Sequence, residues 1–269
     1  MGRLWAARPR LGEDRLRADG LRPLHRRYGQ PSDCQCIIAS VLNLKVIALA
    51  TSLGLAGSAS AGTPKSDEGN SAQPLPIAPV LSEVEARRHN DLVKRGSDLI
   101  DPYMRLADRP TKKAADAARD LRAGIRLLDE ALRLNPGNWS ALWIQGKAFQ
   151  TLGDHPQAYA RFKRSHTIQR NNPDVDRELM LECLEVGRSN EAVDVGREAL
   201  SKGRKDPGLR ANLALALLVA GRLGEASDEA NAAMHLDPSD AVTKNLVRII
   251  EDVRSGKRPR PHHVSDLDK

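Results

Sequence analysis

The chain has 269 residues, with 42 Lys and Arg against 35 Asp and Glu, which gives a formal net charge of +7. Residues 1–61 hold nine of the basic and four of the acidic residues, so the remainder carries 33 basic and 31 acidic residues, a net charge of only +2. This near balance argues against nucleic-acid binding, and an aromatic content of 3% leaves few rings on which single-stranded bases could stack.

Residues 1–40 contain eight arginines and no lysine, and they show neither helical nor strand periodicity. Forty such residues ahead of a secretory signal are anomalous, and the simplest account is spurious translation before a true start at Val41 or Leu42. The alternatives are a long signal peptide with a genuine, disordered Arg-rich extension, or an uncleaved anchor. With a genuine extension, the chain could be a cytoplasmic regulator that binds nucleic acid through this arm.

Residues 41–61 predict a secretory signal peptide. Lys45 precedes a largely apolar run, 46–57, and the small residues Ala59-Ser60-Ala61 follow it, as at a cleavage site. The run is too short to span a bilayer, which takes about 20 residues. We therefore expect cleavage near Ala61, a periplasmic or secreted bacterial protein, and no membrane span in the mature chain. Residues 62–81 include four prolines and predict a disordered linker.

Residues 82–138 predict two helices. The first begins near Ser82, where Ser82 and Glu85 can form a capping box, and runs to about Asp101, because the following Pro102 disfavours helical geometry. The second runs from about Pro110 to Leu134 and carries an amphipathic stripe. The members of that stripe are Leu121, Ile125, Leu128 and Leu132.

A period of 34 residues runs through the second half of the chain. Three series share it: turn glycines, alanines five residues later, and small residues seven places after those. The series are Gly153, Gly187 and Gly221; Ala158, Ala192 and Ala226; and Ser165, Ala199 and Ala233. A fixed period of this length predicts an array of stacked units, because one unit cannot bury its apolar face alone.

These residues resemble the tetratricopeptide-repeat family, in which helix A, a glycine turn and a helix B with small crossing residues form one unit. The resemblance implies an all-α, right-handed superhelical solenoid of antiparallel helix pairs. It places three repeats within 139–238, a degenerate unit before them, a capping helix at 239–254 and a disordered basic tail at 255–269. Met180 and Gly196 depart from the family pattern, so we expect the middle repeat to be less tightly packed.

We find no pattern of catalytic residues. None of the histidines has the spacing of a metallohydrolase helix, and there is no phosphate-binding glycine loop or nucleophile elbow. Cys183, on the core face of a predicted helix, is interpreted as a small buried apolar residue. The sequence therefore predicts no enzyme activity, no cofactor and no metal site.

The family's usual binding surface is a concave groove lined by the A helices, and the resemblance places one set of residues there in each repeat. These are Trp143, Lys147, Gln150 and Thr151; Arg177, Leu181, Leu184 and Glu185; and Ala211, Leu215, Leu218 and Val219. The groove changes from polar to apolar along its length. Exposed leucines predict a partner, either an amphipathic helix or an extended apolar peptide.

The sequence thus predicts an exported scaffold that binds a protein or peptide through this groove, in envelope assembly or secretion. The alternative is a structural, self-associating module whose groove is filled by its own chain or by a second copy. A homo-oligomer is possible, and size in solution separates the two functions, because a monomer with an open groove favours the scaffold.

Overall fold

The computed structural model describes residues 79–104, 114–203 and 205–268. Within these residues the regular structure is helical, and the prediction of an all-α fold is confirmed. The predicted extension, signal peptide and linker, together with the start of the second helix near Pro110, lie outside the described residues.

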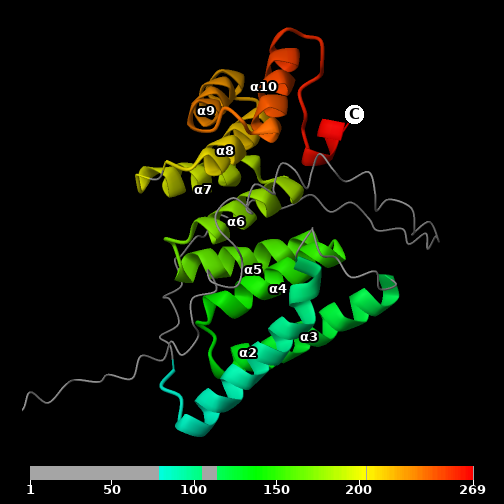
Figure 1. The fold of residues 1–269 in the computed structure, drawn as a ribbon, viewed down its shortest axis with the longest axis vertical. Helices are drawn as coiled ribbons and strands as arrows, with labels where there is room; N and C mark the ends of the chain where they lie inside the picture. Colours follow the sequence, from blue (N-terminus) through cyan, green and yellow to red (C-terminus); the bar gives the residue numbers. More distant parts are fainter. Residues whose placement is uncertain (1–78, 105–113, 204, 269) are drawn as a thin grey trace, which may run out of the picture. The chain divides into compact units, whose positions relative to one another are not determined.

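The helices follow one another in antiparallel pairs (Figure 1). Neighbours in the chain pack against each other, and α4 also contacts α2, as α8 contacts α6 and α10. Every second helix therefore lies on one common face. The bounds are α2 Glu83–Met104, α3 Ala114–Leu134, α4 Trp139–Leu152, α5 His155–Ile168, α6 Pro173–Glu185, α7 Ser189–Ser201, α8 Pro207–Val219, α9 Leu223–Leu236, α10 Ala241–Arg254 and the 3-10 helix η4 Val264–Asp268.

Helix α2 begins at the predicted capping box. The Ser82 N–H donates to the Glu85 carboxylate at 2.9 Å, and the Glu85 N–H donates to the Ser82 hydroxyl at 3.3 Å. The helix does not stop before Pro102 as expected but continues to Met104. Its last turn is held by a tertiary contact, since buried Tyr103 donates a hydrogen bond to Asp120 of α3 at 2.8 Å.

Glycine turns join the two helices of each repeat. Gly153, Gly187 and Gly221 have φ values of 76°, 75° and 81°, in the left-handed region that residues with a Cβ rarely adopt. The Gly153 N–H donates to the Gln150 carbonyl, and the next N–H donates to the Phe149 carbonyl, which closes the end of α4. The turns predicted from the 34-residue period are confirmed.

The small residues of helix B lie where the paired helices cross. Ala158, Ala192 and Ala226 have no exposed surface. The unit formed by α2 and α3 achieves the same close approach with two glycines, because a Cβ on Gly124 would lie 2.8 Å from the carbonyl oxygen of Gly96.

The middle repeat is not loosely packed, contrary to expectation. Met180 is 1% exposed, and its side chain fills the space beside Gly196, where an added Cβ would lie 2.7 Å from the Met180 Cε. The two departures from the family pattern therefore compensate each other, because the large residue has moved from helix B to helix A.

The predicted disordered tail is also wrong for residues 255–268. The chain turns back at Gly256, whose φ is 74°, and forms η4. Val264 and Leu267 are 2% and 4% exposed and belong to the same buried cluster as the leucines of α6 and α8. A second cluster fills the space between α2, α3 and α4, and Trp143 and Phe149 pack against both.

Candidate partner-binding groove

The predicted groove residues all lie on α4, α6 and α8. Because these helices occupy equivalent places in successive repeats, each position recurs after 34 residues. Lys147, Leu181 and Leu215 make one such series, and Gln150, Leu184 and Leu218 make another. The two ends of this face differ in chemistry and in exposure.

A hydrogen-bonded network occupies the end formed by α4 and α6. The Lys147 ammonium lies 2.9 Å from a Glu178 carboxylate oxygen and donates to Gln150 at 2.6 Å. The Gln150 amide donates to Glu178 at 3.1 Å and to Glu182 at 2.9 Å. These bonds join two neighbouring repeats and fix the orientation of the long side chains, which remain partly exposed.

Glu182 lies beneath this network with no exposed surface. Its second carboxylate oxygen is 3.0 Å from Nδ1 of His155, at the start of α5. The hydrogen bond to Glu182 raises the pKa of His155, against the opposing effect of burial. Burial also raises the pKa of neighbouring Glu185. Glu182 is therefore held in place by Gln150 of α4 and by His155 of α5.

Arg177 is committed to structure rather than free for a ligand. Its side chain is only 11% exposed, and it forms ion pairs with Asp174 at 2.7 Å and with Asp206 at the start of α8. Asp206 also accepts a hydrogen bond from the Leu209 N–H, so Arg177 links α6 to the helix cap of the next repeat.

The apolar end formed by α6 and α8 is not open. The prediction that the groove leucines are exposed is wrong, because the four leucines and Val219 are at most 8% exposed. Their cluster includes residues of α10 and the two apolar residues of η4. The segments after the last repeat therefore complete a core at the place where an open surface was expected. The residues concerned are Leu181, Leu184, Leu215, Leu218 and Val219.

Sequence reasoning missed Glu178 and Glu182. The signal was present in the period: Glu182 aligns with Ala148 and Ala216, which are both buried without exposed surface. A carboxylate at a core position of the repeat requires polar partners. His155 and Gln150 are those partners.

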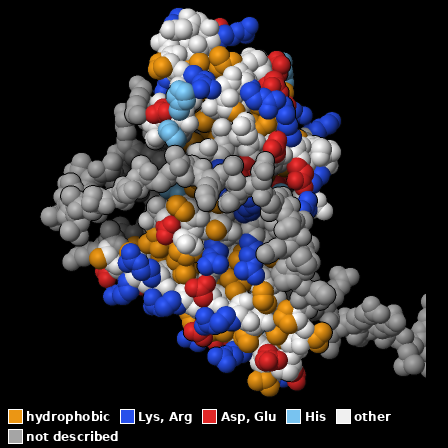
Figure 2. Space-filling model, turned by 180° about the vertical axis from the view of Figure 1, so that it is seen from behind, with side chains coloured by type: hydrophobic (Ala, Val, Ile, Leu, Met, Phe, Trp, Pro, Cys, Tyr) orange, Lys and Arg blue, Asp and Glu red, His pale blue; other side chains and the backbone are white. Residues whose placement is uncertain are grey.

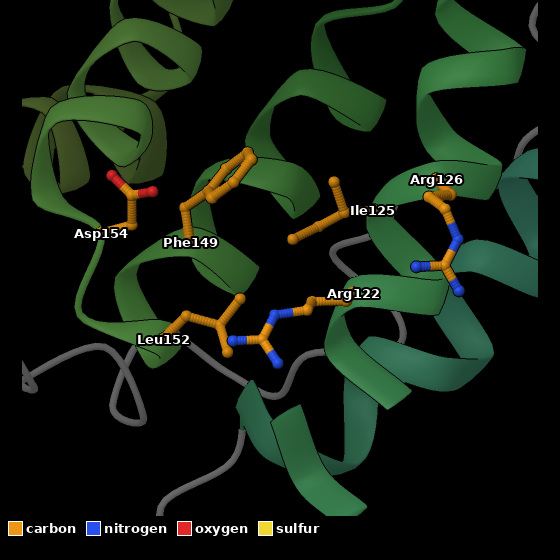
Figure 3. A pocket seen from close by; sticks show the side chains of 6 residues that line it. All are labelled: Arg122, Ile125, Arg126, Phe149, Leu152 and Asp154. Atoms are coloured by element: carbon orange, nitrogen blue, oxygen red, sulfur yellow. The ribbon is translucent and has the colours of Figure 1, made fainter. Parts of the chain in front are cut away.

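A pocket of about 370 Å³ lies between α3 and α4, and none of its lining residues belongs to the predicted groove. Figure 3 shows Ile125 directed toward Phe149, with the Arg122 guanidinium beside Leu152, while Arg126 points away. Figure 2 shows Lys and Arg side chains gathered among apolar ones over the part of the molecule that contains α2 and α3. The lining thus combines apolar side chains with the Arg122 guanidinium and the Asp154 carboxylate.

Among the residues that the structure describes, we find no group of three or more His, Cys, Asp or Glu side chains placed to hold a metal ion. None of their helices is both long enough and apolar enough to cross a membrane.

Comparison with known proteins places the repeats in a wider context. A family model described as tetratricopeptide repeat matches residues 113–173. A crystal structure of MamA superposes with a TM-score of 0.50 at 14% identity, covering 62% of this chain and 84% of that one. A fragment of MamA from Desulfovibrio magneticus RS-1 gives a TM-score of 0.50 at 17% identity, covering 62% and 86%. No curated protein sequence matches the chain.

Proposed function

We propose that this chain is a tetratricopeptide-repeat protein and an exported scaffold whose protein partner binds on the α4–α6 end of the groove. The observation that carries this proposal is the preorganised polar network of Lys147, Gln150 and Glu178, which stays partly exposed beside half-buried Trp143. Ordered side chains lose less entropy on binding than free ones do.

The partner segment is then read by charge and hydrogen bonding at this end. Trp143 provides an apolar contact, and Lys147 and Glu185 provide the charges that orient the segment. The near-neutral net charge of residues 62–269 fits recognition through such local charged groups rather than through a long-range electrostatic field. A role in envelope assembly or secretion follows from the proposed export.

Site-specific photo-crosslinking tests the binding surface. A photoreactive residue at exposed Thr151, on the groove side of α4, should capture a partner in cells, whereas one at exposed Lys244 on α10 should not. Substituting Lys147 and Gln150 by Ala should reduce the Thr151 adduct by about tenfold, which corresponds to 1.4 kcal/mol. An adduct of equal yield at Lys244 would show that the surface is misassigned.

Export has its own test. Protein isolated from its native source should begin at Gly62-Thr63-Pro64-Lys65, because the proposed cleavage follows Ala61. Recovery from the cytoplasm of a chain that still contains Arg3 to Arg27 would contradict both export and the misassigned start.

A further inference from the structure

The segment 257–268 lies on the apolar end of the groove. Figure 1 shows the chain leaving α10 and running back beside it toward the C-terminus. A Cβ on Gly221, the turn glycine after α8, would collide with the Arg260 guanidinium, so Arg260 lies directly over that turn. His263 is close enough to Glu185, at the end of α6, to affect its titration. The tail thus reaches both apolar helices of the groove face.

Few side chains fasten this segment to the repeats. Pro261, Val264 and Leu267 are buried, while His262, His263 and Ser265 are exposed. Val264 and Leu267 are three residues apart, so one turn of η4 presents both to the same side. The attachment is therefore an apolar pair on a short helical turn, which is a common form of peptide anchor.

Several polar groups of the segment form hydrogen bonds with one another. Asp266 accepts hydrogen bonds from the N–H groups of His262 and His263, both at 3.0 Å. The Arg258 guanidinium donates to the carbonyls of Asp266 and Leu267. Within the described residues, a single backbone hydrogen bond joins the segment to α10, from the Arg258 N–H to the Asp252 carbonyl at 3.1 Å. These hydrogen bonds would remain within the segment if it moved away from the groove.

Helix α10 already covers the last repeat. It packs on both α8 and α9, and its Leu246, Ile249 and Ile250 are at most 2% exposed. The solenoid is therefore capped before the tail begins, and covering the end of the array does not require the tail.

We propose that residues 257–268 are a tethered ligand of the α6–α8 groove, released when a partner presents the same chemistry. That chemistry is a short segment with two aliphatic residues three apart, preceded by arginine and proline. The inference rests on the scaffold function proposed above but concerns the opposite end of the groove.

The tether gives the tail an advantage over any free competitor. A short linker holds a tethered ligand at an effective concentration on the order of millimolar. A partner must exceed this level, either by tighter contacts or by binding the α4–α6 end as well. The groove is then closed at rest and opens to a partner that engages both ends.

A chain that stops after Gly256 provides the main experiment. A fluorescent peptide with the sequence of residues 257–268 is titrated with the truncated chain and with the full chain, and anisotropy is measured. We expect the truncated chain to bind at least tenfold more tightly. A peptide with Val264→Ser and Leu267→Ser should lose at least tenfold in affinity, whereas one with Ser265→Ala, at an exposed position, should bind as the original does.

Hydrogen exchange on the full chain tests release directly. The amides of residues 257–268 should exchange at least tenfold faster than those of α8, since the segment leaves without unfolding the repeats. Exchange of both at one common rate, or unfolding of the truncated chain, would make the tail an integral part of the core and overturn the proposal. Equal binding by both chains, or by the serine peptide, would also overturn it.

Two outcomes separate this inference from the proposals around it. Dimers of the full chain that form through exchanged tails, seen by sedimentation, would assign the segment to a second copy and overturn the tethered arrangement. If the truncated chain fails to bind the peptide but the Thr151 crosslink still forms, the tethered ligand is refuted and the proposed scaffold function is not. The reason is that Thr151 lies at the other end of the groove.

Discussion

The first repeat, α4–α5, and the middle repeat, α6–α7, place their bulk on opposite helices. In the first, Gly146 on helix A faces Phe162 on helix B, and an added Cβ on Gly146 would lie 2.6 Å from the Phe162 ring. In the middle repeat Met180 faces Gly196, at the same two positions 34 residues later. One geometry therefore accepts either order of large and small, provided that the pair together fills the space.

The two repeats also differ in polarity. Where α4 has buried Ile144 and Ala148, α6 has Glu178 and Glu182, and both acids bond back to α4. The first repeat supplies the hydrogen-bond donors, Lys147 and Gln150, and the middle repeat supplies the carboxylates that accept from them. Volume is thus balanced within a repeat, whereas charge is balanced between repeats, and the following experiments separate the two.

Phe162→Ala should give the largest effect. The ring has no exposed surface and faces a glycine that cannot fill the resulting space. Replacing a buried Phe by Ala costs about 3–5 kcal/mol of unfolding free energy. Urea denaturation followed by circular dichroism measures it. Lys163→Ala, at the exposed next position, is the control, and similar midpoints for the two variants would refute the packing assigned to α5.

Gly196→Phe should destabilise the middle repeat by about 1–3 kcal/mol, because the ring would overlap Met180. Adding Met180→Gly recreates the first repeat's arrangement and should recover part of that loss, even though Met180→Gly alone is destabilising. A double-mutant cycle should give a coupling of about 0.5–3 kcal/mol. Purely additive effects would mean that the two positions do not share one space.

Glu182→Ala should cost about 1–3 kcal/mol, since His155 and Gln150 would each lose a hydrogen-bond partner in a partly buried site. Alanine is the residue that the other two repeats carry here, so volume alone predicts little loss. Asp194→Ala, at an exposed position on α7, should change stability by no more than about 0.5 kcal/mol. Equal effects of the two substitutions would show that the network adds nothing to stability.

The smallest expected effect is on the pH dependence of stability. Because the folded-state pKa of His155 is raised, its contribution is fully present below the unfolded value, about 6.5, and is lost as pH rises through the higher folded value. Wild type should therefore exceed His155→Gln in stability by more at about pH 5.5 than at about pH 9. The equivalent residues of the other repeats, Ser189 and Leu223, do not titrate in this range. A difference independent of pH would exclude the pair as its source.

Local features of the fold could be predicted from the sequence because they depend on neighbours in the chain. A left-handed turn favours glycine, so Gly153, Gly187 and Gly221 mark the turns of three repeats. The capping box at Ser82 and Glu85 depends on residues three apart. Crossing alanines recur with the period because each repeat presents the same face to the same neighbour.

The candidate site was only half predictable. Its helices and positions follow from the period, but their exposure depends on what the rest of the chain covers. Leu215 and Leu218 were expected in the open and are buried in one cluster with Val264 and Leu267, some fifty residues later in the sequence. The basic, proline-containing segment 255–268 has no periodicity from which this contact could be predicted.

The repeats, their turns and the two helices of each repeat can be predicted from the amino-acid sequence alone, because they depend on residue spacings that recur along the chain. Three features became visible only in the folded chain: Met180 fills the space beside Gly196, Glu182 bonds to His155, and the tail shares a buried cluster with the groove leucines. The physical reason is that packing, pairing and covering are set by side chains that meet in space, at separations along the chain that no local pattern records.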